Sequence, residues 1–289
     1  MKGKGEADDA PQEPDHLDAE EREDVAERQT GSALVIYEVI RAAGDEELHR
    51  PASGLFFSAL AAGIGVCASL LGVATLRGHL PDAPWVELVA ALGYTLGFII
   101  VVLGNLQLFT EATVTAVLPV VADPRPINVL RLFRLWGIVL VGNLVGTFIV
   151  ASMIAQTWIV DAEGLDGALE FAGHLTEYGF GELLVLGIPA GFLIASLAWI
   201  LPNARENALG VVIAITWLVS AGGFAHVVVG SAEAWLLLLA GQVGIAWVLF
   251  GFILPAFLGN VIGGSGLFAL IAYGQVREEM ALARRTPHD

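Results

Sequence analysis

Long uncharged apolar stretches recur along this chain, and they limit its possible folds more than any other feature. They are residues 52–76, 88–110, 135–160, 183–204, 207–232 and 234–276. The hydrocarbon core of a bilayer is about 30 Å thick, and a helix crosses it with roughly 20 apolar residues. The last stretch has 43 residues, but Pro255 and the glycines that follow it indicate a bend or break. The sequence therefore predicts an all-α polytopic membrane protein with six transmembrane helices within residues 51–276.

Charged residues are too scarce for a soluble protein. They make up 15% of the chain, against roughly 25% in soluble domains. Only eight Lys/Arg and fifteen Asp/Glu follow residue 50. This composition excludes a water-soluble enzyme and a nucleic-acid binder that relies on a basic face. A disulfide scaffold is excluded as well, because Cys67 is the one cysteine.

The two ends of the chain are polar. Residues 1–30 are acidic and poor in large apolar residues, so we expect a disordered cytoplasmic tail with no secretory signal. Residues 31–50 carry apolar side chains at helical spacing, namely Leu34, Val35, Val39 and Ile40. This spacing indicates either an interfacial helix that leads into the first span or a solvated helix with no special role. We expect residues 277–289 to form a second cytoplasmic tail.

Basic residues fall unevenly on the two faces that six spans define. Thirteen Lys/Arg lie on the face that holds both tails and the loops after the second and fourth spans. Only Arg77 lies on the opposite face. Because Lys and Arg are retained on the cytoplasmic side, we expect both termini to be cytoplasmic.

A short motif, G-N-x-x-G, occurs twice. It spans residues 142–146 in the third apolar stretch and 259–263 in the sixth, with its asparagines 117 residues apart. Three spans per half place the halves in opposite orientations, which predicts an inverted 3+3 repeat with interrupted helices and a substrate path at the interface. The alternative is that the motif holds helix-packing glycines with a chance asparagine.

His226 is the only histidine inside a predicted span. An ionisable residue at membrane depth is a functional candidate by default, and an imidazole can exchange a proton with a passing weak acid near neutral pH. The alternative is a neutral ring bonded to a backbone carbonyl freed by Gly222 and Gly223. Thr110 stands at the place in the second span that the repeat relates to His226. Its hydroxyl could hold the imidazole in one tautomer.

Apolar side chains flank both of these residues. Leu108 and Phe109 precede Thr110, and Phe224 precedes His226. They could form constrictions that strip water from a permeant species, although aromatic residues in a span more often pack against other helices.

Three further polar residues lie in or near the spans. The amides of Asn143 and Asn260 need hydrogen-bond partners, which each other or the interrupted segments could give. Glu111 either caps a helix over residues 112–121, where the helix dipole favours a carboxylate, or faces the mouth of a pore.

Enzyme motifs are absent from the sequence. There is no phosphate-binding loop, cysteine pair, histidine cluster at metal spacing or nucleophile elbow. We expect no enzyme activity, no cofactor and no metal site.

Together, Leu108–Thr110, the segment Phe224-Ala225-His226 and the two G-N-x-x-G motifs resemble the formate/nitrite transporter family over about residues 50–276. The resemblance implies an aquaporin-like protomer with broken second and fifth helices, assembled as a homopentamer in the bacterial inner membrane. It implies transport of small monovalent anions such as formate or nitrite. It places Thr110 in a hydrogen bond with the central His226, where protonation lets the anion cross as a neutral acid. The family alignment adds Tyr94 and Phe98 to one constriction and puts Asn260 beside the pore.

The chain departs from the family in two places, so its substrate need not be formate. The family's vestibule lysine is missing from the region 172–177, and Gly191 stands where the family has an asparagine. The loop between the third and fourth spans carries six carboxylates and no Lys or Arg.

Two other functions stay open. The six carboxylates of the loop between the third and fourth spans, together with the missing lysine, suit a pore for neutral or cationic small solutes. The acidic tail suits a membrane scaffold or sensor that does not transport.

Overall fold

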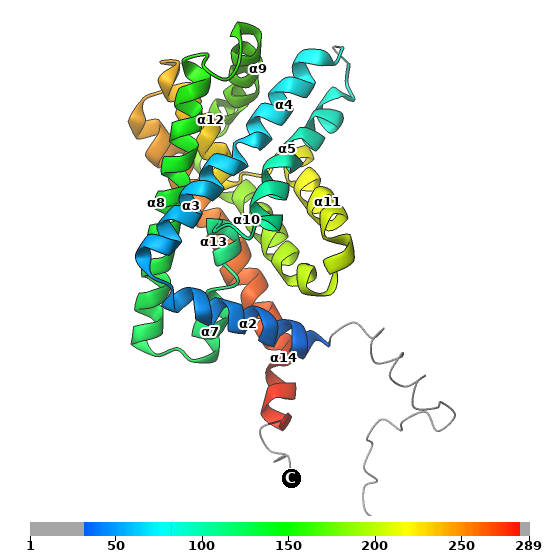
Figure 1. Ribbon diagram of the computed structural model, residues 1–289, viewed down its shortest axis with the longest axis vertical. Helices are drawn as coiled ribbons and strands as arrows, with labels where there is room; N and C mark the ends of the chain where they lie inside the picture. The colour runs from blue at the N-terminus through cyan, green and yellow to red at the C-terminus, as the bar shows by residue number, and fades with distance from the viewer. Residues whose placement is uncertain (1–31, 82, 284–289) are drawn as a thin grey trace, which may run out of the picture.

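The computed structural model describes residues 32–81 and 83–283, and in these ranges every regular element is a helix. Figure 1 shows the helices packed side by side along the long axis of the molecule. Their bounds are α2 (Ala33–His49), α3 (Ala52–Val66), α4 (Ala68–His79), α5 (Val86–Leu103), α6 (Phe109–Ala112), α7 (Val117–Ala122), α8 (Pro126–Ala155), α9 (Ala162–Gly173), η1 (His174–Glu177), α10 (Phe180–Ile200), η2 (Leu201–Asn203), η3 (Arg205–Asn207), α11 (Ala208–Ala221), α12 (Val227–Leu239), η4 (Trp247–Ile253), α13 (Leu254–Val261), η5 (Ile262–Ala269) and α14 (Leu270–Ala283). The acidic tail predicted over 1–30 lies outside the described residues.

Most of these helices form six membrane crossings, as predicted. Five helical segments are long and apolar enough to span a bilayer alone: Ala52–His79, Val86–Leu103, Pro126–Ala155, Phe180–Asn203 and Trp247–Met280. The remaining crossing is divided between α11 and α12, with 14 and 13 residues. Each of these covers about 20 Å at 1.5 Å per residue, so both are needed to cross the core. The second crossing is also interrupted, because α6 and α7 follow α5 after a five-residue gap.

The predicted bounds of three spans were wrong, because they were set by the positions of charged residues. The second span does not end at residue 110 but continues to Ala122 past Glu111. The fifth does not end at 232, since α12 carries Glu233 inside it and runs to Leu239. The sixth therefore begins at Trp247 rather than at 234. Charge marks a boundary only where the side chain faces lipid, and both carboxylates face the protein interior.

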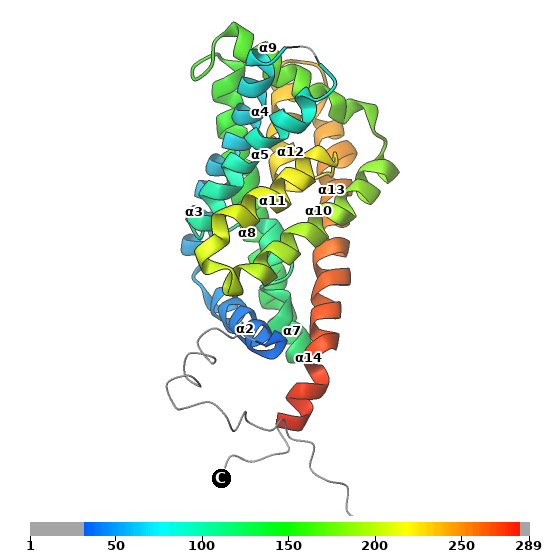
Figure 2. The same ribbon diagram turned by 90° about the vertical axis from the view of Figure 1, so that its right-hand side faces the viewer.

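Helix α2 lies across one end of the molecule, with α14 beside it, and α9 lies at the opposite end (Figures 1 and 2). Ser32 caps α2 by accepting a hydrogen bond from the Val35 amide. The helix buries Tyr37, Ile40, Gly44 and Leu48 and leaves Val35 and Val39 exposed. One face of this helix therefore packs on the protein, while Val35 and Val39 stay exposed and Val39 lines a cavity described below.

The two halves pack in the same way, which confirms the inverted repeat. Helix α3 packs against α8, and α10 packs against α13 and η5. A Cβ added to Gly63 would overlap the backbone of Asn143, and one added to Gly191 would overlap the backbone of Asn260. The glycines of both G-N-x-x-G motifs face the same two interfaces. The motif glycines are therefore helix-packing glycines, as the alternative reading held, and the asparagines have a separate role.

Candidate functional site

The two helix interruptions have the same backbone geometry. After α5, Asn105 has φ of 51°, and the Leu106 amide bonds to the Val101 carbonyl. After α11, Gly223 has φ of 64°, and the Phe224 amide bonds to the Val219 carbonyl. Asn and Gly are the residues that adopt this left-handed conformation most readily. Each chain then runs extended for a few residues and starts a second helix.

Asn143 and Asn260 fasten these extended segments. Asn143 Oδ1 accepts a hydrogen bond from the Phe109 amide, and its Nδ2 donates to the carbonyls of Ala59 and Gln107. Asn260 Oδ1 accepts from the Val227 amide, and its Nδ2 donates to the carbonyls of Gly187 and Ala225. Both side chains are fully buried. The asparagine side chains therefore satisfy the backbone groups that the helix breaks leave unpaired. This is one of the two arrangements predicted from the sequence, in which the interrupted segments provide the hydrogen-bond partners.

This hydrogen bonding also corrects one predicted correspondence. Phe109 and Val227 occupy equivalent positions, as do the helix-capping residues before them, Leu108 and His226. His226 is therefore matched by Leu108 in the repeat, not by Thr110. The sequence error was two residues, because the asparagine spacing fixes the register only approximately.

His226 lies at the start of α12, 2% exposed, with both ring nitrogens engaged. Its Nδ1 accepts a hydrogen bond from the Val229 amide at 3.2 Å. Its Nε2 lies 2.8 Å from Thr110 Oγ1. Because a backbone amide can only donate, Nδ1 carries no proton, and the proton of the neutral ring is on Nε2. Thr110 therefore accepts a hydrogen bond from His226 Nε2 and holds this tautomer.

Aromatic rings surround the imidazole on one side. The ring of Phe98 meets it edge-on with centroids 5.1 Å apart, and Tyr94 packs on Phe98 at 5.4 Å. Phe98, predicted with Tyr94 for one constriction, thus contacts His226, and Tyr94 packs against Phe98. Phe109 does not: it stacks on Phe257 at 5.2 Å and meets Trp136 edge-on at 5.8 Å.

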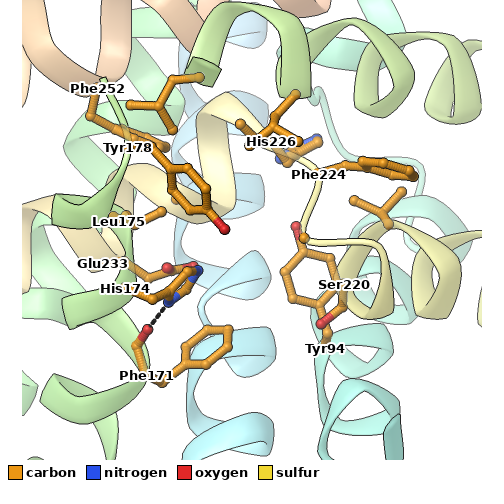
Figure 3. Close-up of a pocket in the computed structure, with 16 residues that line it drawn as sticks. Tyr94, Phe171, His174, Leu175, Tyr178, Ser220, Phe224, His226, Glu233 and Phe252 are labelled. Atoms are coloured by element: carbon orange, nitrogen blue, oxygen red, sulfur yellow. Dashed lines mark hydrogen bonds between the residues drawn. The ribbon is translucent and has the colours of Figure 1, made fainter. Parts of the chain in front are cut away.

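One cavity approaches His226 from the end of the molecule that holds α9, and we call it the α9-side cavity (Figure 3). It has an empty volume of about 480 Å³ and is lined by sixteen residues. Figure 3 shows Phe171, His174, Tyr178 and Glu233 on one side and Tyr94, Ser220, Phe224 and His226 on the other. The predicted residues Tyr94, Phe224 and His226 are brought together here.

A second cavity opens near α2, and we call it the α2-side cavity. It has an empty volume of about 1070 Å³ and is lined by Asn105, Glu111, Thr115 and Arg205 among others. A smaller recess beside it adds Glu47, Gln107 and Leu108. Glu111 therefore faces a cavity, and the predicted helix over 112–121 is instead the short α7 preceded by turns. The predicted constriction residues Leu108 and Phe224 lie at opposite cavities.

Several polar residues near these cavities were not predicted as site residues. Glu47 Oε1 accepts a hydrogen bond from Gln107 Nε2 at 2.9 Å, and Glu47 Oε2 accepts one from Thr115 Oγ1 at 3.4 Å. Burial raises the pKa of Glu47 above its ordinary value, and these two hydrogen bonds partly offset the effect. In the α9-side cavity, His174, Tyr178 and Glu233 were missed. The signal for Glu233 was present, because it is the only charged residue between 207 and 276.

Residues 34–274 match the family profile of formate/nitrite transporters. The chain belongs to the formate/nitrite transporter family. This family member is 39% identical over 259 residues to the inner membrane protein YfdC of Escherichia coli strain K12, which covers 90% of this chain and 84% of that protein. It is 27% identical to the formate channel FocA of Haemophilus influenzae, over 73% of this chain and 82% of FocA.

Solved structures share the fold. A pentameric formate channel with formate bound superimposes with a TM-score of 0.68 at 23% identity, over 78% of this chain and 98% of that one. An ion channel of the same family gives a TM-score of 0.66 at 20% identity, over 84% and 96%. Members of this family are channels and transporters, so the chain is a membrane transport protein and not an enzyme.

Proposed function

We propose that this protein is a channel or transporter for small monovalent weak-acid anions of the formate and nitrite type. The observation that carries the proposal is the hydrogen bond between Thr110 and His226, which joins the two interrupted helices. Cavities approach this junction from both ends of the molecule. Buried aromatic and aliphatic side chains surround it, and an unpaired anion is unstable in such a place.

Protonation lets the substrate pass the junction as a neutral acid. Thr110 retains the proton on Nε2, so a second proton on His226 belongs on Nδ1, which must first release the Val229 amide. Releasing one hydrogen bond costs about 1 kcal/mol. Transfer of the Nδ1 proton to the anion then gives the neutral acid and returns the ring to the tautomer of the structure.

The protein works as a homopentamer in the bacterial inner membrane, with both termini in the cytoplasm. A pentameric formate channel shares its fold, and YfdC, its relative, is an inner membrane protein. Helix α5 exposes Leu88, Leu92, Leu96, Ile100 and Leu103 along one side, a surface that suits lipid or a neighbouring subunit. Arg77 is the one described arginine near the α9 end, and the others lie toward the α2 end. This asymmetry supports a cytoplasmic α2 end.

Flux into proteoliposomes that carry an internal pH dye tests the proposal. Formate and nitrite should acidify the lumen of vesicles with the parent protein, and His226→Ala should lose this response while it still assembles. If the parent protein transports neither anion into the vesicles, the proposal is wrong. It is also wrong if the His226→Ala variant keeps the parental flux.

A second candidate is a pore for neutral or cationic small solutes. It is favoured by the α9-side cavity, where Glu233 is the one carboxylate and no lysine or arginine lines the wall. Ammonium and methylammonium belong in the same flux assay for this reason. Uptake of these amines that does not respond to a pH gradient, together with no anion flux, would select this candidate.

A further inference from the structure

Glu233 occupies an unusual place in this molecule. It lies in the middle of α12, is 4% exposed, and lines the α9-side cavity. Its carboxylate borders the cavity, and among the residues that the structure describes it has neither a hydrogen bond nor an ion pair. A buried carboxylate without a partner is strongly disfavoured as an anion unless a proton or a cation accompanies it.

The groups around Glu233 provide no permanent positive charge. Tyr94, His174, Tyr178 and His226 are the other titratable groups of the cavity. The titratable groups on the helices packed against α12 are Glu163, Asp166 and Glu170 of α9, Arg77 and His79 of α4, Arg131 and Arg134 of α8, and Glu111 of α6. Arg77 is ion-paired to Glu87 at 2.7 Å and to Glu170 at 3.6 Å. Arg131 and Arg134 lie in the first turns of α8, toward the α2 end.

Glu233 and His226 lie on the same helix and face the same cavity. They are seven residues apart, which is two helical turns or about 10 Å along the axis. An anion that enters the α9-side cavity from the α9 end must therefore pass the Glu233 carboxylate to reach His226. Repulsion between the anion and a charged Glu233 in this partly desolvated cavity reduces the occupancy of the cavity by the anion by about a hundredfold.

We propose that Glu233 controls anion entry from the α9 end, because the cavity accepts an anion only when Glu233 carries a proton. The neutral carboxylic acid offers an O–H donor to the anion, whereas the carboxylate excludes it. Entry is thereby tied to a proton one step before His226, whose own ring nitrogens are both occupied. This inference rests on the proposed transport of weak-acid anions and names a second residue of the same path.

The test measures the concentration of formate that gives half-maximal flux, with external pH varied from acidic to alkaline. Glu233→Gln and Glu233→Leu both remove the charge, and either one that assembles as the parent does gives the answer. Glu177→Gln is the matched control, because Glu177 is exposed near the same end and does not line the cavity. In the parent and the control, this concentration should rise by about tenfold or more as the pH is raised. In the Glu233 variants it should stay nearly constant.

A Glu233 variant with the same pH dependence as the parent overturns the inference and leaves the proposed function intact. Parent vesicles that move no formate overturn the proposed function instead. In that case infrared spectroscopy tests whether Glu233 takes up a proton. Acidification should produce a carboxylic-acid C=O band in the parent that Glu233→Gln lacks. The same band in both proteins overturns the assignment. Methylammonium that competes with formate in the parent but not in Glu233→Gln also overturns it, because Glu233 then binds a cation rather than a proton.

Discussion

Asn143 and Asn260 make the same three hydrogen bonds in the two halves of the molecule. Each side-chain oxygen accepts a hydrogen bond from the first backbone amide of the helix that follows the break. Each side-chain nitrogen donates to one carbonyl of the extended segment and to one carbonyl of a neighbouring helix, α3 or α10. One of the segments that they fasten leads into α6, which carries Thr110, and the other ends at His226. The site is thus placed by a pair of asparagines whose side chains bond to backbone groups rather than to the His226 ring.

Replacing either asparagine by leucine should destabilise the protein strongly. Asn143→Leu and Asn260→Leu each remove three hydrogen bonds and leave buried backbone groups unpaired, for a loss of about 3 kcal/mol or more. The two variants should show similar drops in the melting temperature of the detergent-solubilised protein. A drop in only one of them would mean that the two halves do not depend on their asparagines equally.

Thr110 should matter through its oxygen rather than through its size. Thr110→Val keeps the shape but leaves the Nε2 proton of His226 without an acceptor, and we expect anion flux to fall by about tenfold or more. Thr110→Ser keeps the hydroxyl and should retain most of the flux. Equal flux in both variants would show that the tautomer of His226 is not fixed by residue 110.

The close contact at Gly191 should not tolerate a methyl group. Gly191→Ala places a Cβ against the backbone of Asn260, and overpacking of this kind costs about 1–3 kcal/mol. Gly210→Ala in α11 is the control, because open space surrounds that position. We expect a lower melting temperature only for Gly191→Ala.

Stability should depend on pH through Glu47. Its pKa is raised by burial, so the folded protein holds the proton more tightly than the unfolded chain does. The folded state therefore loses stability as the pH rises from the ordinary value of 4.5 toward the raised one. Glu47→Gln removes this loss and keeps an oxygen for Gln107. Its melting temperature relative to the parent should increase over that pH range, whereas the exposed Glu46→Gln should show no such trend.

Much of the site could be found from sequence, because its key residues are exceptions to a local pattern. His226 is an ionisable residue in an apolar stretch, and the repeated G-N-x-x-G motif exposes the symmetry of the chain. The role of Asn143 and Asn260 followed from the need to satisfy polar groups at membrane depth. Glu233 carries the same signal as His226, but in the sequence it marks the end of an uncharged stretch, because a sequence alone does not show whether a carboxylate faces lipid or a cavity.

The sequence by itself determined the six crossings, the inverted repeat and the interruptions near Thr110 and His226, since hydropathy and spacing are properties of the chain itself. Only the tertiary structure decided which side chains face the path. The spanning helices are apolar on all sides, so periodicity does not mark the pore-facing side, and helix packing alone selects it. That selection matched His226 with Leu108, placed Phe109 among Trp136 and Phe257, and turned Glu233 into the α9-side cavity.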